Sequence, residues 1–252
     1  NIASSTILSK EYILKKLDET NYYSTLYSEV ESSFENYIYQ SGLDEDVIKN
    51  IVTEEEIKQD TIQIINNLYS KEVVNIDVSK IENRLQENID NSLEGQNISN
   101  ATKESIKQFI GQITNAYKDT IVHTKYENSI NNILTKVTEY VEKAKTILLV
   151  ADVVLIVLLL LLSAKKIVKG TVDLGIAILG VGIFNIAVNI IVNAKVKIDY
   201  ITIISDGFSM TIRSILHDIM NIINTSGIIL VIVGIIIIFI SNVLIMKKKQ
   251  EE

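Results

Sequence analysis

Three long apolar runs near the carboxyl end constrain this chain more than any other feature. They cover residues 147–164, 174–194 and 226–246, and the third run is the most apolar. Helices of this length are about 27 to 32 Å long at 1.5 Å per residue, which is enough to cross the hydrocarbon core of a bilayer. We therefore predict three transmembrane helices.

The preceding residues, 1–146, have the opposite character. They hold 24 acidic and 15 basic side chains, whereas the remainder of the chain holds 7 and 9. Such an acidic surface repels phosphate, so nucleic acid is not an expected partner. Apolar residues recur at helical spacing in this part, and the whole chain lacks proline. The predicted fold class is an all-α membrane protein, in which an acidic bundle of about six helices runs on into a three-helix transmembrane region.

Local signals set several helix boundaries in the acidic part. Gly42 and Gly95 are placed as stops at helix carboxyl ends. Thr53 and Glu56 have the spacing of a capping box, so a helix should start there. The β-branched run 73–78 is expected to be an extended link, and Asp77 to cap the helix after it.

Basic residues predict the topology. Lys165, Lys166 and Lys169 lie in the short loop 165–173, and the tail 247–252 begins with three lysines. The positive-inside rule places both segments in the cytoplasm. Domain 1–146 and the segment 195–225 are then extracytoplasmic in a bacterial plasma membrane. Export of that domain requires a preceding signal peptide or a further span, so we expect one upstream.

Polar residues inside the predicted spans are the first candidate sites. Asp152 lies near the outer end of the first span, where it either contacts a cation or a basic partner residue, or reaches interfacial water. Asn185, Asn189 and Asn193 recur every four residues, so their amides share one helix face. That face either lines a permeation path or forms hydrogen bonds between helices, and we favour the second interpretation.

Small residues mark a packing surface on the third span. Gly227, Gly234 and Ser241 recur every seven residues and form a seam against which another helix can pack closely. The amphipathic stretch 208–223 leads into this span. It is expected either to lie on the bilayer surface or to cap the base of the acidic domain.

Tyrosines gather in the first forty residues and suggest a surface for a protein or glycan partner. The residues expected to be most accessible there are Tyr22, Tyr23 and Tyr39.

Metal or cofactor binding is not expected. The chain has no cysteine, and its two histidines, His123 and His217, lie far apart in sequence. The acidic run from Asp44 to Glu55 resembles a calcium loop in part, but Lys49 stands where such a loop needs glycine. We interpret this run as a solvated turn and helix start.

No phosphate loop, dinucleotide turn or catalytic triad is recognisable, so the chain is not expected to be an enzyme. We interpret it as a cell-envelope membrane protein whose outer helical domain binds a protein partner, forms a homo-oligomer or helps to assemble a larger membrane complex. The alternatives are a subunit of an oligomeric channel or transporter that uses Asp152 and the asparagine face, and an accessory or immunity protein that regulates another membrane machine.

Overall fold

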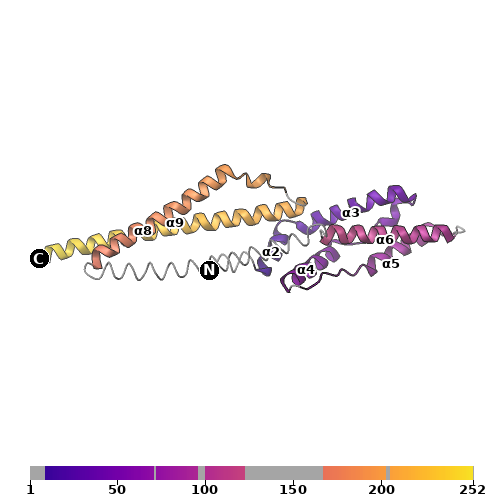
Figure 1. Ribbon diagram of the computed structural model, residues 1–252, viewed down its shortest axis with the longest axis horizontal. Coiled ribbons are helices and arrows are strands. Elements are labelled where there is room, and N and C mark those ends of the chain that lie inside the picture. The colour runs from indigo at the N-terminus through magenta and orange to yellow at the C-terminus, as the bar shows by residue number, and fades with distance from the viewer. Residues whose placement is uncertain (1–8, 71, 96–99, 123–166, 203–204, 252) are drawn as a thin grey trace. The chain divides into compact units, whose positions relative to one another are not determined.

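The computed structural model describes residues 9–70, 72–95, 100–122, 167–202 and 205–251 (Figure 1). All regular secondary structure in these ranges is helical, as predicted. The chain divides into two units. The first, here called the bundle, holds the described residues up to Val122 together with 202–211. The second, here called the helix pair, holds residues 167–201 and 212–251.

Five α-helices and one short 3-10 helix form the described part of the bundle up to Val122. In Figure 1, α3 and α6 run side by side. Their bounds are α2 Lys10–Glu19, α3 Tyr22–Ser41, η1 Glu45–Ile48, α4 Glu54–Ser70, α5 Ser79–Ser92 and α6 Asn100–Val122.

Several predicted helix boundaries are confirmed. Helix α3 ends before Gly42, which takes a left-handed conformation with a φ of 72° that glycine adopts without strain. At the start of α4, Thr53 and Glu56 form the expected reciprocal capping box. Residues 72–78 belong to no helix or strand, and Asp77 then accepts a hydrogen bond from the Ser79 amide at the start of α5.

The bundle core collects the apolar stripe of each helix. Removing these side chains from water is the main favourable contribution to folding. Its largest fully buried side chains include Phe34 and Leu26 of α3, Ile57 of α4, Leu85 and Ile89 of α5, and Ile113 and Tyr117 of α6.

The carboxylates of the acidic turn before α4 have partners within the turn. Asp44 accepts a hydrogen bond from the Asp46 amide and so caps η1. Asp46 forms an ion pair with Lys49. These carboxylates thus have local partners in the turn, in keeping with its interpretation as a solvated turn and helix start.

Two helices are long and apolar enough to cross a membrane. They are α8, Ile167–Lys195, and α9, Asp206–Glu251. The short helix η2, Ile198–Tyr200, lies between them. The first predicted span, 147–164, lies outside the described residues.

Both long helices extend past the predicted boundaries. Helix α8 begins inside the expected loop 165–173, and α9 includes most of the segment 195–225 as well as the predicted span 226–246. The amphipathic stretch 208–223 is therefore the start of one continuous helix, since neither proline nor a left-handed residue interrupts α9.

Candidate functional site

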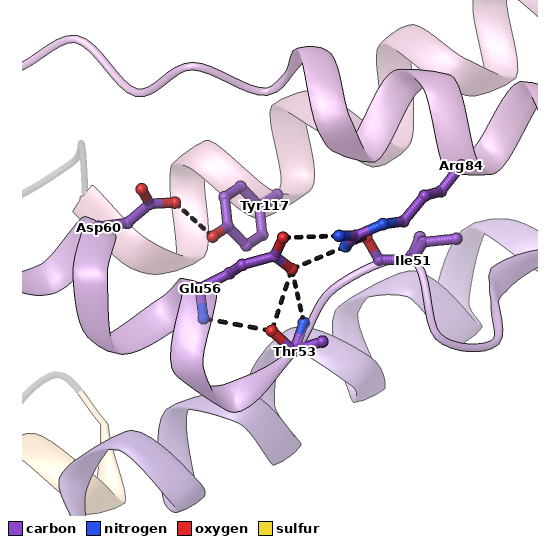
Figure 2. A network of polar contacts seen from close by, with 6 residues as sticks. All are labelled: Ile51, Thr53, Glu56, Asp60, Arg84 and Tyr117. Atoms are coloured by element: carbon purple, nitrogen blue, oxygen red, sulfur yellow. Dashed lines mark hydrogen bonds and ion pairs between the residues drawn. The ribbon is translucent and has the colours of Figure 1, made fainter.

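A polar network joins three helices of the bundle (Figure 2). The two terminal nitrogens of Arg84, on α5, each donate to one carboxylate oxygen of Glu56, on α4, at 2.7 Å. Arg84 also donates to the main-chain oxygen of Ile51 at 3.1 Å. Because a guanidinium and a carboxylate match in this two-point geometry, the pair fixes α5 against the start of α4.

The Glu56 carboxylate takes part in two interactions, the ion pair with Arg84 and the capping box of α4. The same carboxylate accepts a hydrogen bond from the Thr53 amide at 3.1 Å, so it completes the capping box while it pairs with Arg84. The hydrogen bonds from Arg84 and Thr53 hold the pKa of Glu56 below its usual value, although partial burial acts against them. Glu56 is therefore ionised at neutral pH.

Tyr117 extends this network to α6. Its hydroxyl donates to a carboxylate oxygen of Asp60 at 2.6 Å, and the tyrosine is almost fully buried. Burial raises the pKa of Asp60, and burial together with Asp60 raises the pKa of Tyr117. The phenol therefore stays protonated and acts as a donor, so this contact stabilises the bundle and offers no nucleophile.

An open acidic hollow of about 390 Å³ lies beside the start of α4. Lys58 bonds to Asp18 at 2.7 Å, and its ammonium group lies 5.1 Å from the centre of the Tyr23 ring. Three carboxylates face one amine here, which favours a cationic ligand group. The lining residues are Asp18, Asn21, Tyr23, Ser24, Glu54, Glu55 and Lys58.

Sequence reasoning missed this hollow. The run of three glutamates at the start of α4, Glu54 to Glu56, was the available signal. Its first two members line the hollow, whereas the third points to Arg84.

The prediction that Tyr22 and Tyr23 are accessible is wrong. Each is only 5% exposed, and their rings pack edge to face at 5.8 Å. Asn21 adopts a left-handed conformation just before α3, and the first turn of α3 then packs both rings into the core. Burial and the charge of Asp18 raise the pKa of Tyr23 to about 12. Tyr39, by contrast, is 76% exposed and stays a candidate for partner binding.

The first turn of α9 is part of the bundle. Gly207 packs so closely against Tyr22 and Thr25 that an added Cβ would lie 3.2 to 3.4 Å from their side chains. The hydroxyls of Thr20 and Thr211 are hydrogen-bonded at 2.8 Å. Phe208 packs against the core of the bundle.

Glu29 of α3 binds the start of this turn. Its carboxylate accepts hydrogen bonds from the amides of Gly207 and Asp206 and from the Ser205 side chain. These bonds favour the ionised form, but burial outweighs them and raises the pKa of Glu29. A side chain distant in sequence therefore satisfies amides that α9 leaves free at its start.

The small residues of α9 contact α8 at three places, as an interhelical packing surface requires. A Cβ on Gly234 would lie 2.9 Å from the Gly175 oxygen, and a Cβ on Gly227 would lie 2.9 Å from the Gly182 oxygen. Beyond them, Ser241 donates to Thr171 at 2.9 Å. Since only glycine permits this approach, the two backbones pack closely over this stretch.

These contacts fix the register of the antiparallel pair. Gly175 pairs with Gly234, and Gly182 with Gly227, so residues 174–183 lie opposite 226–235. Residues 184–194 of α8 therefore lie opposite the part of α9 that precedes the predicted span 226–246. The two spans, as defined from hydropathy alone, are staggered along the pair.

The asparagine face points largely toward α9. The Asn189 amide donates to the main-chain oxygen of Met220 at 2.8 Å, and the Asn185 amide donates to Ser226 at 3.4 Å. Asn193 is exposed and donates to Asn189 at 3.1 Å. Engagement of the first two amides with α9 favours the interhelical interpretation over a permeation path.

The remaining candidates do not form a common site in the described residues. Asp152 and His123 lie outside these residues. His217 is hydrogen-bonded to Asp199 at 2.8 Å, within the helix pair.

No protein-family model, curated protein or solved structure matches the chain.

Replacement of Glu56 by glutamine should make the bundle less stable and its stability less dependent on pH. The pKa of Glu56 is lowered by folding, so its contribution is present above the usual glutamate value of about 4.3 and is lost as the pH falls through the folded value. The difference between wild type and E56Q should shrink in acid. Urea unfolding of the full chain in detergent, followed by tyrosine fluorescence, measures this. The neighbouring exposed Glu55→Gln is the control, and an equal effect of both would contradict the assignment.

Replacement of Glu29 by alanine should free the first turn of α9. Loss of a helix cap costs about 1 kcal/mol, which corresponds to roughly fivefold faster amide exchange. Hydrogen exchange of residues 205–211 in the full chain, read by mass spectrometry, measures it. Glu29→Gln keeps an acceptor and should have a smaller effect, and the exposed Glu35→Ala on the same helix should have none. Unchanged exchange in E29A would show that the cap is dispensable.

Replacement of Gly234 by valine should separate α8 from α9, because its side chain would overlap the α8 backbone. The chain has no native cysteine, so the pair Thr171→Cys and Ser241→Cys reports the contact through disulfide formation. We expect G234V to reduce cross-linking several-fold. Gly180→Val is the matched control, since a Cβ there meets nothing within 4 Å. Equal cross-linking in both variants would contradict close packing at Gly234.

Proposed function

We propose that this chain is a non-enzymatic membrane protein of the bacterial cell envelope, and that its acidic bundle binds a protein partner outside the cytoplasm. The observation that supports this proposal most is the contrast between the two units. The bundle buries its apolar side chains, whereas the helix pair exposes them.

The exposed side chains of the helix pair need an apolar solvent. Phe184 of α8 is 67% exposed and Phe239 of α9 is 68% exposed. They belong to long rows of exposed isoleucine and valine on both helices. In water such a continuous surface would drive association, whereas lipid satisfies it at no cost. Lys247 follows the apolar stretch of α9, and the positive-inside rule places this end in the cytoplasm.

The bundle offers a surface of a different kind. Its acidic hollow is open to solvent, and Glu54 and Glu55 at its edge are exposed. A basic segment of a partner protein fits this charge, because arginine and lysine side chains pair with carboxylates that a partner can reach. Exposed carboxylates of this kind act mainly on association rate and specificity, so the partner complex is expected to weaken at high salt.

Cross-linking in intact cells tests the proposal. A membrane-impermeant, amine-reactive cross-linker should reach the exposed lysines of the bundle and join it to a basic partner, which mass spectrometry then identifies. The double variant Glu54→Gln and Glu55→Gln should reduce the yield of this conjugate several-fold. Glu82→Gln with Glu87→Gln removes the same charge from an exposed face of α5 and is the matched control.

Each outcome of this experiment has a distinct meaning. Reaction of the bundle only after cell lysis would show that it does not lie outside. Reaction in intact cells without any conjugate would argue against partner binding. A conjugate that both double variants reduce equally would reflect net charge and would exclude the hollow as the binding site.

A further inference from the structure

Residues 196–201, which follow α8, are held in a defined conformation. Ile198 of η2 is only 4% exposed and fixes the segment from within. From α9, Arg213 donates to the main-chain oxygen of Ile201 at 2.7 Å, and His217 bonds to Asp199 at 2.8 Å. Two basic side chains of α9 thus bind the connecting segment, whose own amides form further turns.

This conformation presents an aromatic ring and two amines to the surroundings. Tyr200 is 79% exposed, and the Lys197 ammonium group lies 5.7 Å from the centre of its ring. Lys195 and Lys197 are both exposed. Val196 between them is 46% exposed. Arg213 and His217 thus bind the backbone and Asp199. The charged groups of Lys195 and Lys197 remain exposed.

Apolar surface continues up to this segment. Ile190 and Ile191, in the last turns of α8, are 61% and 60% exposed. If α8 crosses a bilayer, lipid must reach these two side chains. Lys195 follows Ile191 by about 6 Å along the helix axis, which is the depth of the headgroup layer beyond the hydrocarbon core, and Lys197 comes just after the end of α8.

We infer that Lys195, Lys197 and Tyr200 form an interfacial anchor that binds the phosphate groups of membrane phospholipids. This inference rests on the proposed membrane location of the helix pair. The lysine amines bond to lipid phosphate, and the tyrosine ring lies between the acyl chains and water, as aromatic and basic residues do at membrane surfaces. Because the bonds from Arg213 and His217 already order this segment before lipid binds, it loses little conformational freedom on binding.

The test uses tryptophan as a depth probe, because the chain contains no native tryptophan. The full chain with Tyr200→Trp is reconstituted into phosphatidylcholine vesicles that carry bromine either near the headgroup or deep in the acyl chains. Tyr39→Trp is the matched control, since Tyr39 in the bundle is 76% exposed and Tyr200 is 79% exposed. Phe239→Trp on α9 reports whether the helix pair is inserted at all.

We expect blue-shifted emission from Y200W and stronger quenching by shallow bromine than by deep bromine. Tyr39→Trp should emit as in water and should not be quenched. Lys195→Gln with Lys197→Gln in the Y200W background should reduce the shallow quenching, because the anchor loses its phosphate contacts.

The remaining outcomes separate this inference from the proposed function. Quenching of F239W without quenching of Y200W would overturn the anchor and leave membrane insertion intact. Absence of quenching in both would overturn the membrane location itself. Quenching of Y200W that the lysine replacements leave unchanged would overturn phosphate binding.

Discussion

Free amides at helix starts are the constraint on which the described bundle depends. Each helix begins with backbone N–H groups that have no partner within the helix. At four helix starts, carboxylate oxygens supply partners: Asp44 for η1, Glu56 for α4, Asp77 for the start of α5 and Glu29 for α9. The positive end of the helix dipole favours the same arrangement. Part of the acidity of this chain is therefore structural.

The helix pair meets a different constraint, because its outer surface is apolar. Where lipid is the solvent, burial of apolar side chains between helices gains little, and close backbone contact and polar groups must hold them together. Glycines permit that contact in the middle of the pair. The hydroxyls of Thr171 and Ser241 bond near one end, and Asn189 bonds to the Met220 backbone near the other. The polar groups thus face the partner helix, and the aliphatic and aromatic side chains face outward.

The sequence predicts features that depend on a few neighbouring residues. Gly42 and the pair Thr53 and Glu56 act through bonds within one turn, so spacing alone identifies them. The seven-residue recurrence of Gly227 and Gly234 likewise identifies a packing face, although it does not identify α8 as the partner. That partner depends on Gly175 and Gly182, whose seven-residue spacing matches only once the two helices are paired.

Features that depend on tertiary packing escape such reasoning. The burial of Tyr22 and Tyr23 follows from the left-handed turn at Asn21, which directs the start of α3 inward. The pairing of Glu29 with Gly207 joins residues far apart in sequence, and no local pattern indicates it. The continuity of α9 across residue 226, where the predicted span begins, escapes such reasoning for the same reason. Because the first turn of α9 belongs to the bundle core and the same helix continues into the apolar stretch, this region contains a structural element that both units share. A hydropathy profile records only the change in composition along that helix, so it divides one helix into an amphipathic segment and a span.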